Sequence, residues 1–213
     1  MVSFLLAAAF AMVSCQAEVP KSGSAASPSS AEGTCEGILD AQVKAAMKRI
    51  ADIPQSVKVT YLGNPQRTAD HLVAQHDVGS ASEWDDTNFC GVHTGSTGLE
   101  SVRVSFSLPE EPHETGHAAS IFKEYKMAKA ALAGVKVGVL YFECSSKKFA
   151  MGAGATVLIR GEVRSRYETS EPEEAAREDT LRIVYESSRA LSDLLGCKSN
   201  AGLPSSFSMP PEV

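Results

Sequence analysis

The first 15 residues, MVSFLLAAAFAMVSC, form an apolar stretch that closes on Cys15. Such a stretch is too short to cross the ~30 Å hydrocarbon core of a bilayer as a permanent helix. It has the length of the apolar core of a secretory signal peptide. We therefore expect the chain to be exported and residues 1–14 to be removed as a signal peptide.

The end of this stretch, Met12-Val13-Ser14-Cys15, resembles the bacterial lipobox, in which apolar or small residues precede a cysteine. In proteins with this motif the cysteine thiol receives a diacylglyceryl group, and the chain is cut just before it. The resemblance implies that Cys15 carries a lipid, with acyl chains such as palmitate, and anchors the protein to the extracytoplasmic face of the cell membrane. Plain secretion and an uncleaved membrane anchor are the alternatives.

The next residues, 16–34, read QAEVPKSGSAASPSSAEGT and are dominated by Ser, Ala, Gly and Pro. A segment of this composition buries too little apolar surface to offset the entropy lost on ordering. As a flexible coil it would span about 24 Å root-mean-square. We expect residues 15–34 to be a lipidated cysteine followed by a flexible linker that lifts a domain away from the lipid headgroups.

The charge of the chain argues against one class of partner. It has 20 Lys+Arg and 26 Asp+Glu, which gives a formal net charge of −6. Binding to nucleic-acid phosphates needs a basic face, which this balance does not favour. We therefore expect no nucleic-acid partner.

Hydrophobic periodicity predicts the elements of one domain. Apolar residues recur at helical spacing in three segments, which are 36–51, 120–133 and a long helix that follows a capping-box arrangement at 170–173 and ends at Gly196. Apolar and polar residues alternate in four predicted strands, which are 56–62, 101–108, 135–144 and 156–164. A glycine-rich turn joins the last two strands, so we expect them to form an antiparallel hairpin.

These elements predict the fold class. We expect one α+β domain over residues 35–197, with a mainly antiparallel sheet of four to five strands. The N-terminal helix and the long C-terminal helix should pack on one face of this sheet. Residues 198–213 are rich in Pro and Ser and are expected to form a loose tail.

With Cys15 assigned to lipid, four cysteines remain, namely Cys35, Cys90, Cys144 and Cys197. An even number in an exported domain, none spaced as CxxC, is typical of disulfides, and three pairings exist. If the first and last helices lie antiparallel, their ends bring Cys35 to Cys197 and leave Cys90 for Cys144, which is the pairing we expect. A zinc site built from these scattered cysteines is the alternative.

The segment HETGH at 113–117 satisfies the HExxH pattern of zinc hydrolases. In that pattern two histidines one helical turn apart, here His113 and His117, bind zinc, and the glutamate, here Glu114, activates the bound water. A proline directly before the segment and a glycine inside it disfavour the rigid helix that this geometry needs. We expect a polar loop here, with no metal or other cofactor.

Other candidate ligands are weaker. Glu124 and Glu143 are the downstream carboxylates available as a third zinc ligand. Trp84, with two aspartates after it, is expected to anchor an acidic loop. His71 and the histidine at 76 are expected to be surface residues. None of these patterns predicts a catalytic set.

Several segments together resemble the surface lipoproteins of actinobacteria of the Streptomyces type. They are the lipobox, the linker, LYFEC at 140–144, and a long closing helix that ends in LGC at 195–197. Those proteins have no assigned activity, so the resemblance implies an architecture and a location. We expect a non-enzymatic, lipid-anchored protein that binds a small molecule or a protein partner at the cell surface. A zinc-dependent hydrolase and a structural subunit of an envelope complex are the alternative functions.

Overall fold

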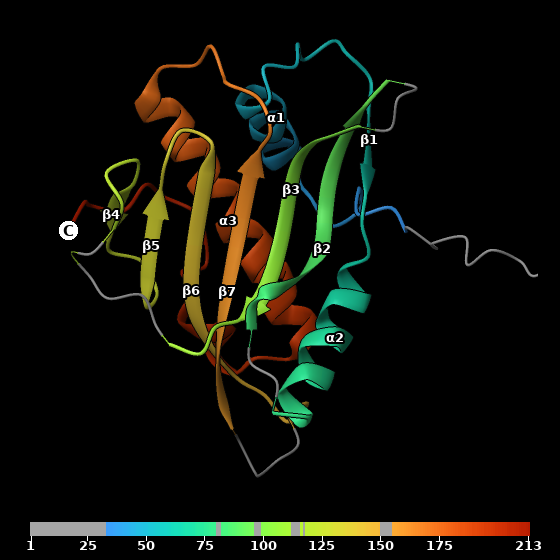
Figure 1. The fold of residues 1–213 in the computed structure, drawn as a ribbon, viewed down its shortest axis with the longest axis vertical. Coiled ribbons are helices and arrows are strands. Elements are labelled where there is room, and N and C mark those ends of the chain that lie inside the picture. The colour runs from blue at the N-terminus through green and yellow to red at the C-terminus, as the bar shows by residue number, and fades with distance from the viewer. Residues whose placement is uncertain (1–32, 80–81, 96–98, 112–115, 117, 150–154) are drawn as a thin grey trace, which may run out of the picture. The chain divides into compact units, whose positions relative to one another are not determined.

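A computed structural model describes residues 33–79, 82–95, 99–111, 116, 118–149 and 155–213, with the side chains of 82–86 left out. Within these ranges one antiparallel sheet packs against helices, and the long C-terminal helix crosses behind it in the view of Figure 1. The expected α+β class, with an N-terminal and a long C-terminal helix, is confirmed. The signal peptide and most of the linker lie outside the described residues.

The sheet has seven strands in the described ranges, not the four to five that we expected. Their bounds are β1 (Val59–Leu62), β2 (Ser82–Thr94), β3 (Leu99–Leu108), β4 (Lys123–Tyr125), β5 (Ala130–Ala133), β6 (Val137–Ser145) and β7 (Thr156–Ser165). The strand order is β1-β2-β3-β7-β6-β5-β4, and every neighbouring pair is antiparallel. The predicted hairpin of β6 and β7 is confirmed.

The helices begin at residues that differ from those we expected. Helix α1 (Ala41–Ile50) starts at the cap Asp40, whose carboxylate accepts a hydrogen bond from the backbone N–H of Val43 at 2.7 Å. Helix α3 (Glu173–Leu195) starts after Pro172 without a side-chain cap, so the predicted capping box is wrong. It ends at Gly196, whose φ of 67° is the left-handed conformation that terminates helices.

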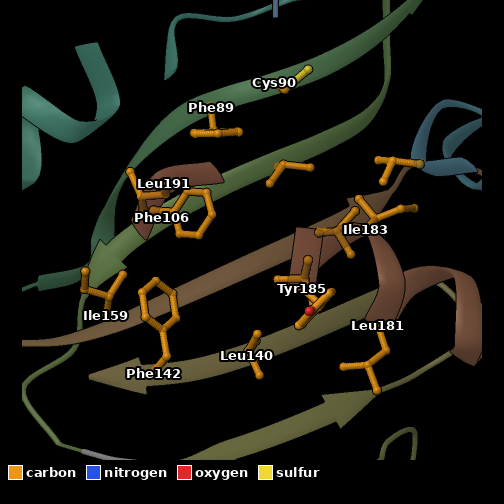
Figure 2. Packing of buried hydrophobic residues seen from close by; sticks show 14 of the residues in the cluster. Phe89, Cys90, Phe106, Leu140, Phe142, Ile159, Leu181, Ile183, Tyr185 and Leu191 are labelled. Atoms are coloured by element: carbon orange, nitrogen blue, oxygen red, sulfur yellow. The ribbon is translucent and has the colours of Figure 1, made fainter. Parts of the chain in front are cut away.

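The core lies between the sheet and the helices. Helix α3 contacts β5, β6 and β7, and helix α2 (Pro65–Asp77) contacts β2, β3 and α3. Figure 2 shows Phe106, Phe142 and Ile159 of the sheet facing side chains of α3. All three are buried, and Phe106 and Ile159 occupy positions that the alternation of apolar and polar residues predicts to be buried.

Besides strand β2, two further segments have structures that differ from what the sequence predicts. Residues 65–77 form α2, which begins with Pro65 after the cap Asn64. The segment 120–133 is the hairpin of β4 and β5 and not a helix. Ala128, between these strands, has φ of 49°, a left-handed conformation that a right-handed helix excludes.

The residues after Cys197 are packed, so the expected loose tail is wrong. The short 3₁₀ helix η1 (Lys198–Gly202) follows, and Leu203 is buried in the core. The hydroxyl of Tyr185 donates a hydrogen bond to the carbonyl of Pro204 at 2.6 Å. At the far end, the N–H of Val213 donates to the carbonyl of Glu124 at 3.0 Å, which places the chain end beside the edge strand β4.

The four cysteines form two disulfides as expected, but their pairing is Cys35–Cys90 and Cys144–Cys197. The predicted pairing is wrong because α1 and α3 differ in length. The ten-residue α1 covers only the first part of α3, where Arg182 donates to the side chain of Gln42. The start of α1 therefore lies beside Arg182, in the middle of α3. From Arg182 to residue 196 the helix runs roughly 20 Å further, at 1.5 Å per residue, so Cys197 lies too far from Cys35 to pair with it.

Candidate ligand-binding face

The residues that the sequence singled out do not form a site in the described ranges. Cys15, His113, Glu114 and His117 all lie outside the described residues. No group of three or more metal-ligating side chains occurs in the part of the chain that the structure describes.

The carboxylates and histidines nominated as weaker candidates have structural partners. The carboxylate of Glu124 accepts hydrogen bonds from the backbone N–H groups of Gly116 and Ala118, at 2.8 to 3.1 Å. Glu143 on β6 pairs with Lys129, the residue before β5, at 2.9 Å. The imidazole of His76 is half-buried on α2, and its ring centroid lies 5.1 Å from that of Phe149. Trp84 and the aspartates after it have no described side chains.

A groove between α1 and α3 is occupied by paired charges. Arg49 donates two hydrogen bonds to the carboxylate of Asp179, at 2.6 and 2.7 Å, and the Asp179 side chain is only 6% exposed. These hydrogen bonds raise the pKa of Arg49 although burial acts in the opposite direction. Because the charges in this groove already satisfy each other, we interpret it as a contact that joins the two helices.

The opposite face of the sheet gathers a different set of side chains. We call it the open face and define it by residues that alternate with core residues on the central strands: Arg103 and Ser105 on β3, Arg160, Glu162 and Arg164 on β7, and Val137, Val139 and Tyr141 on β6. The period of two along a strand places each of these side chains away from the helices. The open face is the candidate site.

A carboxylate held between two guanidinium groups lies at the centre of the open face. Glu162 pairs with Arg160, and Arg164 Nε donates a hydrogen bond to Glu162 Oε1 at 2.8 Å. Burial lowers the pKa of Arg160, but attraction and hydrogen bonding to Glu162 and to Tyr141 outweigh it and raise the pKa overall. The triad carries one net positive charge, and the Arg164 side chain is 62% exposed.

The neighbouring strand adds a third guanidinium. Arg103 on β3 lies directly opposite Arg164 on β7 in the strand register. Like charges placed directly across two strands destabilise a sheet. Arg103 Nε is partly compensated by Glu100, whose Oε2 it contacts at 2.6 Å. Glu100 in turn lies over Gly91, where an added Cβ would stand 2.3 Å from Glu100 Oε1, so the glycine makes room for this carboxylate.

Two adjacent cavities occupy the open face. One, of about 420 Å³, lies among Ser101, Arg103, Ser105 and Arg166. The other, of about 380 Å³, has an apolar wall on β5 and β6 and reaches Arg160. Glu162 and Arg164 line both cavities, so the two are adjacent.

The charge of the open face differs from that of the whole chain. The two cavities are lined by four arginines and two glutamates, which is an excess of positive charge, whereas the chain as a whole carries −6. A local signal existed in the sequence, since three arginines and a glutamate alternate over residues 160–166. The sequence reading used only the apolar half of that alternation and missed the site.

Comparisons of the chain with protein-family models, with curated proteins and with solved structures found no match. The fold and the open face define an α+β domain with two disulfides and a helix-backed antiparallel sheet. Disulfides form and persist in oxidising compartments, so these two fit a secreted or extracytoplasmic protein. In the ranges that the structure describes, no helix is both long and apolar enough to cross a membrane.

Proposed function

We propose that the protein is a non-enzymatic lipoprotein of the cell envelope that binds an anionic ligand or partner at its open face. A lipid on Cys15 would hold the domain at the extracytoplasmic side of the membrane, with the linker as spacer. The observation that carries the binding proposal is the pair Arg103 and Arg164, which face each other across two strands beside a cavity.

An anion between these two arginines would meet guanidinium groups that are 52% and 62% exposed, although each already pairs with a glutamate, Glu100 or Glu162. Guanidinium groups bind carboxylates and phosphates through paired N–H donors, and such charge-assisted hydrogen bonds are roughly twice as strong as neutral ones. Arginine also keeps its proton throughout the physiological pH range, so these groups suit recognition rather than proton transfer. The serines at 101 and 105 add neutral hydrogen-bonding groups to the same cavity.

Binding can be tested by titrating the whole chain with inorganic phosphate and with a hexaglutamate peptide at low ionic strength, followed by calorimetry. We expect Arg164→Ala to weaken both interactions at least tenfold, since a charge-assisted hydrogen bond contributes about 1.5–3 kcal/mol. Arg67→Ala is the matched control, because it removes an exposed arginine on α2 that lines neither cavity of the open face. Equal losses in the two variants would contradict binding at the open face.

The anchor can be tested by intact-mass spectrometry of the protein extracted from its native host. We expect a mature chain that begins at Cys15 and carries the added mass of acyl groups. Cys15→Ser should lose that mass, because a hydroxyl does not replace the nucleophilic thiol. A mature species that begins at another residue, or that lacks the acyl mass, would contradict the lipid anchor.

A further inference from the structure

Half of the open face is apolar, and the chain itself partly covers this half with Ala118 and Phe122. Exposed faces of antiparallel sheets are normally polar. Here a second hydrophobic cluster lies on this face, separate from the main core, and its buried members are Leu132, Val137, Val139 and Tyr141. Phe122, in the segment before β4, packs against the cluster.

The apolar cluster borders directly on the arginines. In the register of β6 and β7, Val137 lies opposite Arg164 and Val139 lies opposite Glu162. The cavity of about 380 Å³ is lined by both kinds of residue, among them Phe122 and Arg160. A ligand that filled this cavity would therefore meet apolar surface and positive charge at the same time.

We propose that the open face binds a single-chain amphiphilic carboxylic acid, with the acyl chain against Phe122 and Val139 and the carboxylate at Arg164. This inference rests on the proposed function, because it names the anion that the open face would bind. The positive charge matches a carboxylate, and the apolar wall matches a hydrocarbon chain. The cavity volume lies at the low end of the 300–1,000 Å³ range of small-molecule sites, which favours one acyl chain over two.

The exposed side chain of Ile121 offers a substitution that spares the fold. It lines the apolar cavity and is 64% exposed, so Ile121→Ser changes the wall of the site at little cost in stability. Leu99, at the start of β3, is 47% exposed and lines neither cavity, so Leu99→Ser is the matched control.

The test is a calorimetric titration of the whole chain with straight-chain carboxylates from butanoate to decanoate, below their micelle concentrations. We expect affinity to rise roughly three- to fourfold per added methylene until the cavity is filled. Decanol, which lacks the charge, should bind at least tenfold more weakly than decanoate. Ile121→Ser should weaken decanoate without affecting butanoate, Leu99→Ser should affect neither, and Arg164→Ala should weaken every carboxylate.

The outcomes separate this inference from the function on which it rests. Affinity that depends on Arg164 but is the same for butanoate and decanoate would overturn the amphiphile and leave an anion-binding face. If Arg164→Ala changes the binding of no carboxylate, and of neither phosphate nor hexaglutamate, both the amphiphilic ligand and the anion-binding face are wrong. An anionic diacyl phospholipid also combines a negative charge with acyl chains, so vesicles of such a lipid are titrated in parallel. Tighter binding to the vesicles than to decanoate would contradict a single-chain acid as the ligand.

Discussion

Replacing Cys144 and Cys197 together with alanine should lower the free energy of unfolding by about 4 kcal/mol. Their disulfide joins β6 to the end of α3 and closes a loop over a sequence separation of 53 residues. A cross-link over a loop of that length restricts the unfolded chain, which is the main source of disulfide stability in the chain-entropy model. Because whole domains are stable by only about 5–15 kcal/mol, the effect is a large fraction of the total. Urea denaturation of the whole chain measures it.

The pairing itself can be tested with the same kind of variant. Replacing Cys35 and Cys90 with alanine should cost a similar amount, since their sequence separation is 55 residues. In a chain that also carries Cys15→Ser, this variant should leave no free thiol in the denatured protein. Replacing Cys35 and Cys197 instead should leave two unpaired cysteines. A thiol assay that finds none in this control variant would contradict the pairing in the structure.

Elements whose apolar residues recur at a regular spacing could be predicted from the sequence. The segment 101–108 was recognised as a strand because its apolar and polar residues alternate without interruption, and β3 spans it. The long closing helix was recognised because one apolar stripe runs along it and a glycine terminates it. In both cases a local pattern determines which face is buried.

Strand β2 was not predicted because its alternation of buried and exposed residues is interrupted. Its register against β3 shifts between Asn88 and Cys90, and Phe89 and Cys90 are both fully buried although they are adjacent in sequence. Such bulges break the period of two on which strand prediction depends. Helix α2 was not predicted for a different reason. The pair Asn64-Pro65 was interpreted as a turn, but an Asn cap followed by Pro is also a common start of a helix.

The candidate site could not be predicted, because it depends on contacts between segments that are distant in sequence. Arg103 and Arg164 become neighbours only through the pairing of β3 with β7. The disulfide pairing depends in the same way on where α1 ends against α3. Local periodicity identifies the exposed face of each strand, but the side-by-side order of the strands decides which exposed residues form one surface.

The position of α3 against the sheet yields the second large prediction, which concerns Gly138 on β6. A Cβ added at this residue would lie 2.7 Å from the carbonyl oxygen of Thr180 and 2.9 Å from its carbonyl carbon. Both atoms belong to the backbone of α3 and cannot move by a change of side-chain rotamer, so the helix itself must shift away from the sheet. We expect Gly138→Ala to lower the free energy of unfolding by about 3 kcal/mol, the upper part of the range for overpacked cores.

The control for this substitution is Gly37→Ala, which adds the same methyl group where no atom lies within 4 Å. Its effect should stay within about 0.5 kcal/mol. Thr180→Ala should not rescue Gly138→Ala, because the close contacts are with the backbone, and that substitution also removes the hydrogen bond from the Thr180 hydroxyl to the carbonyl of Gly134. If Gly138→Ala unfolds at the same urea concentration as the unmodified chain, α3 does not lie as close to β6 as the structure places it.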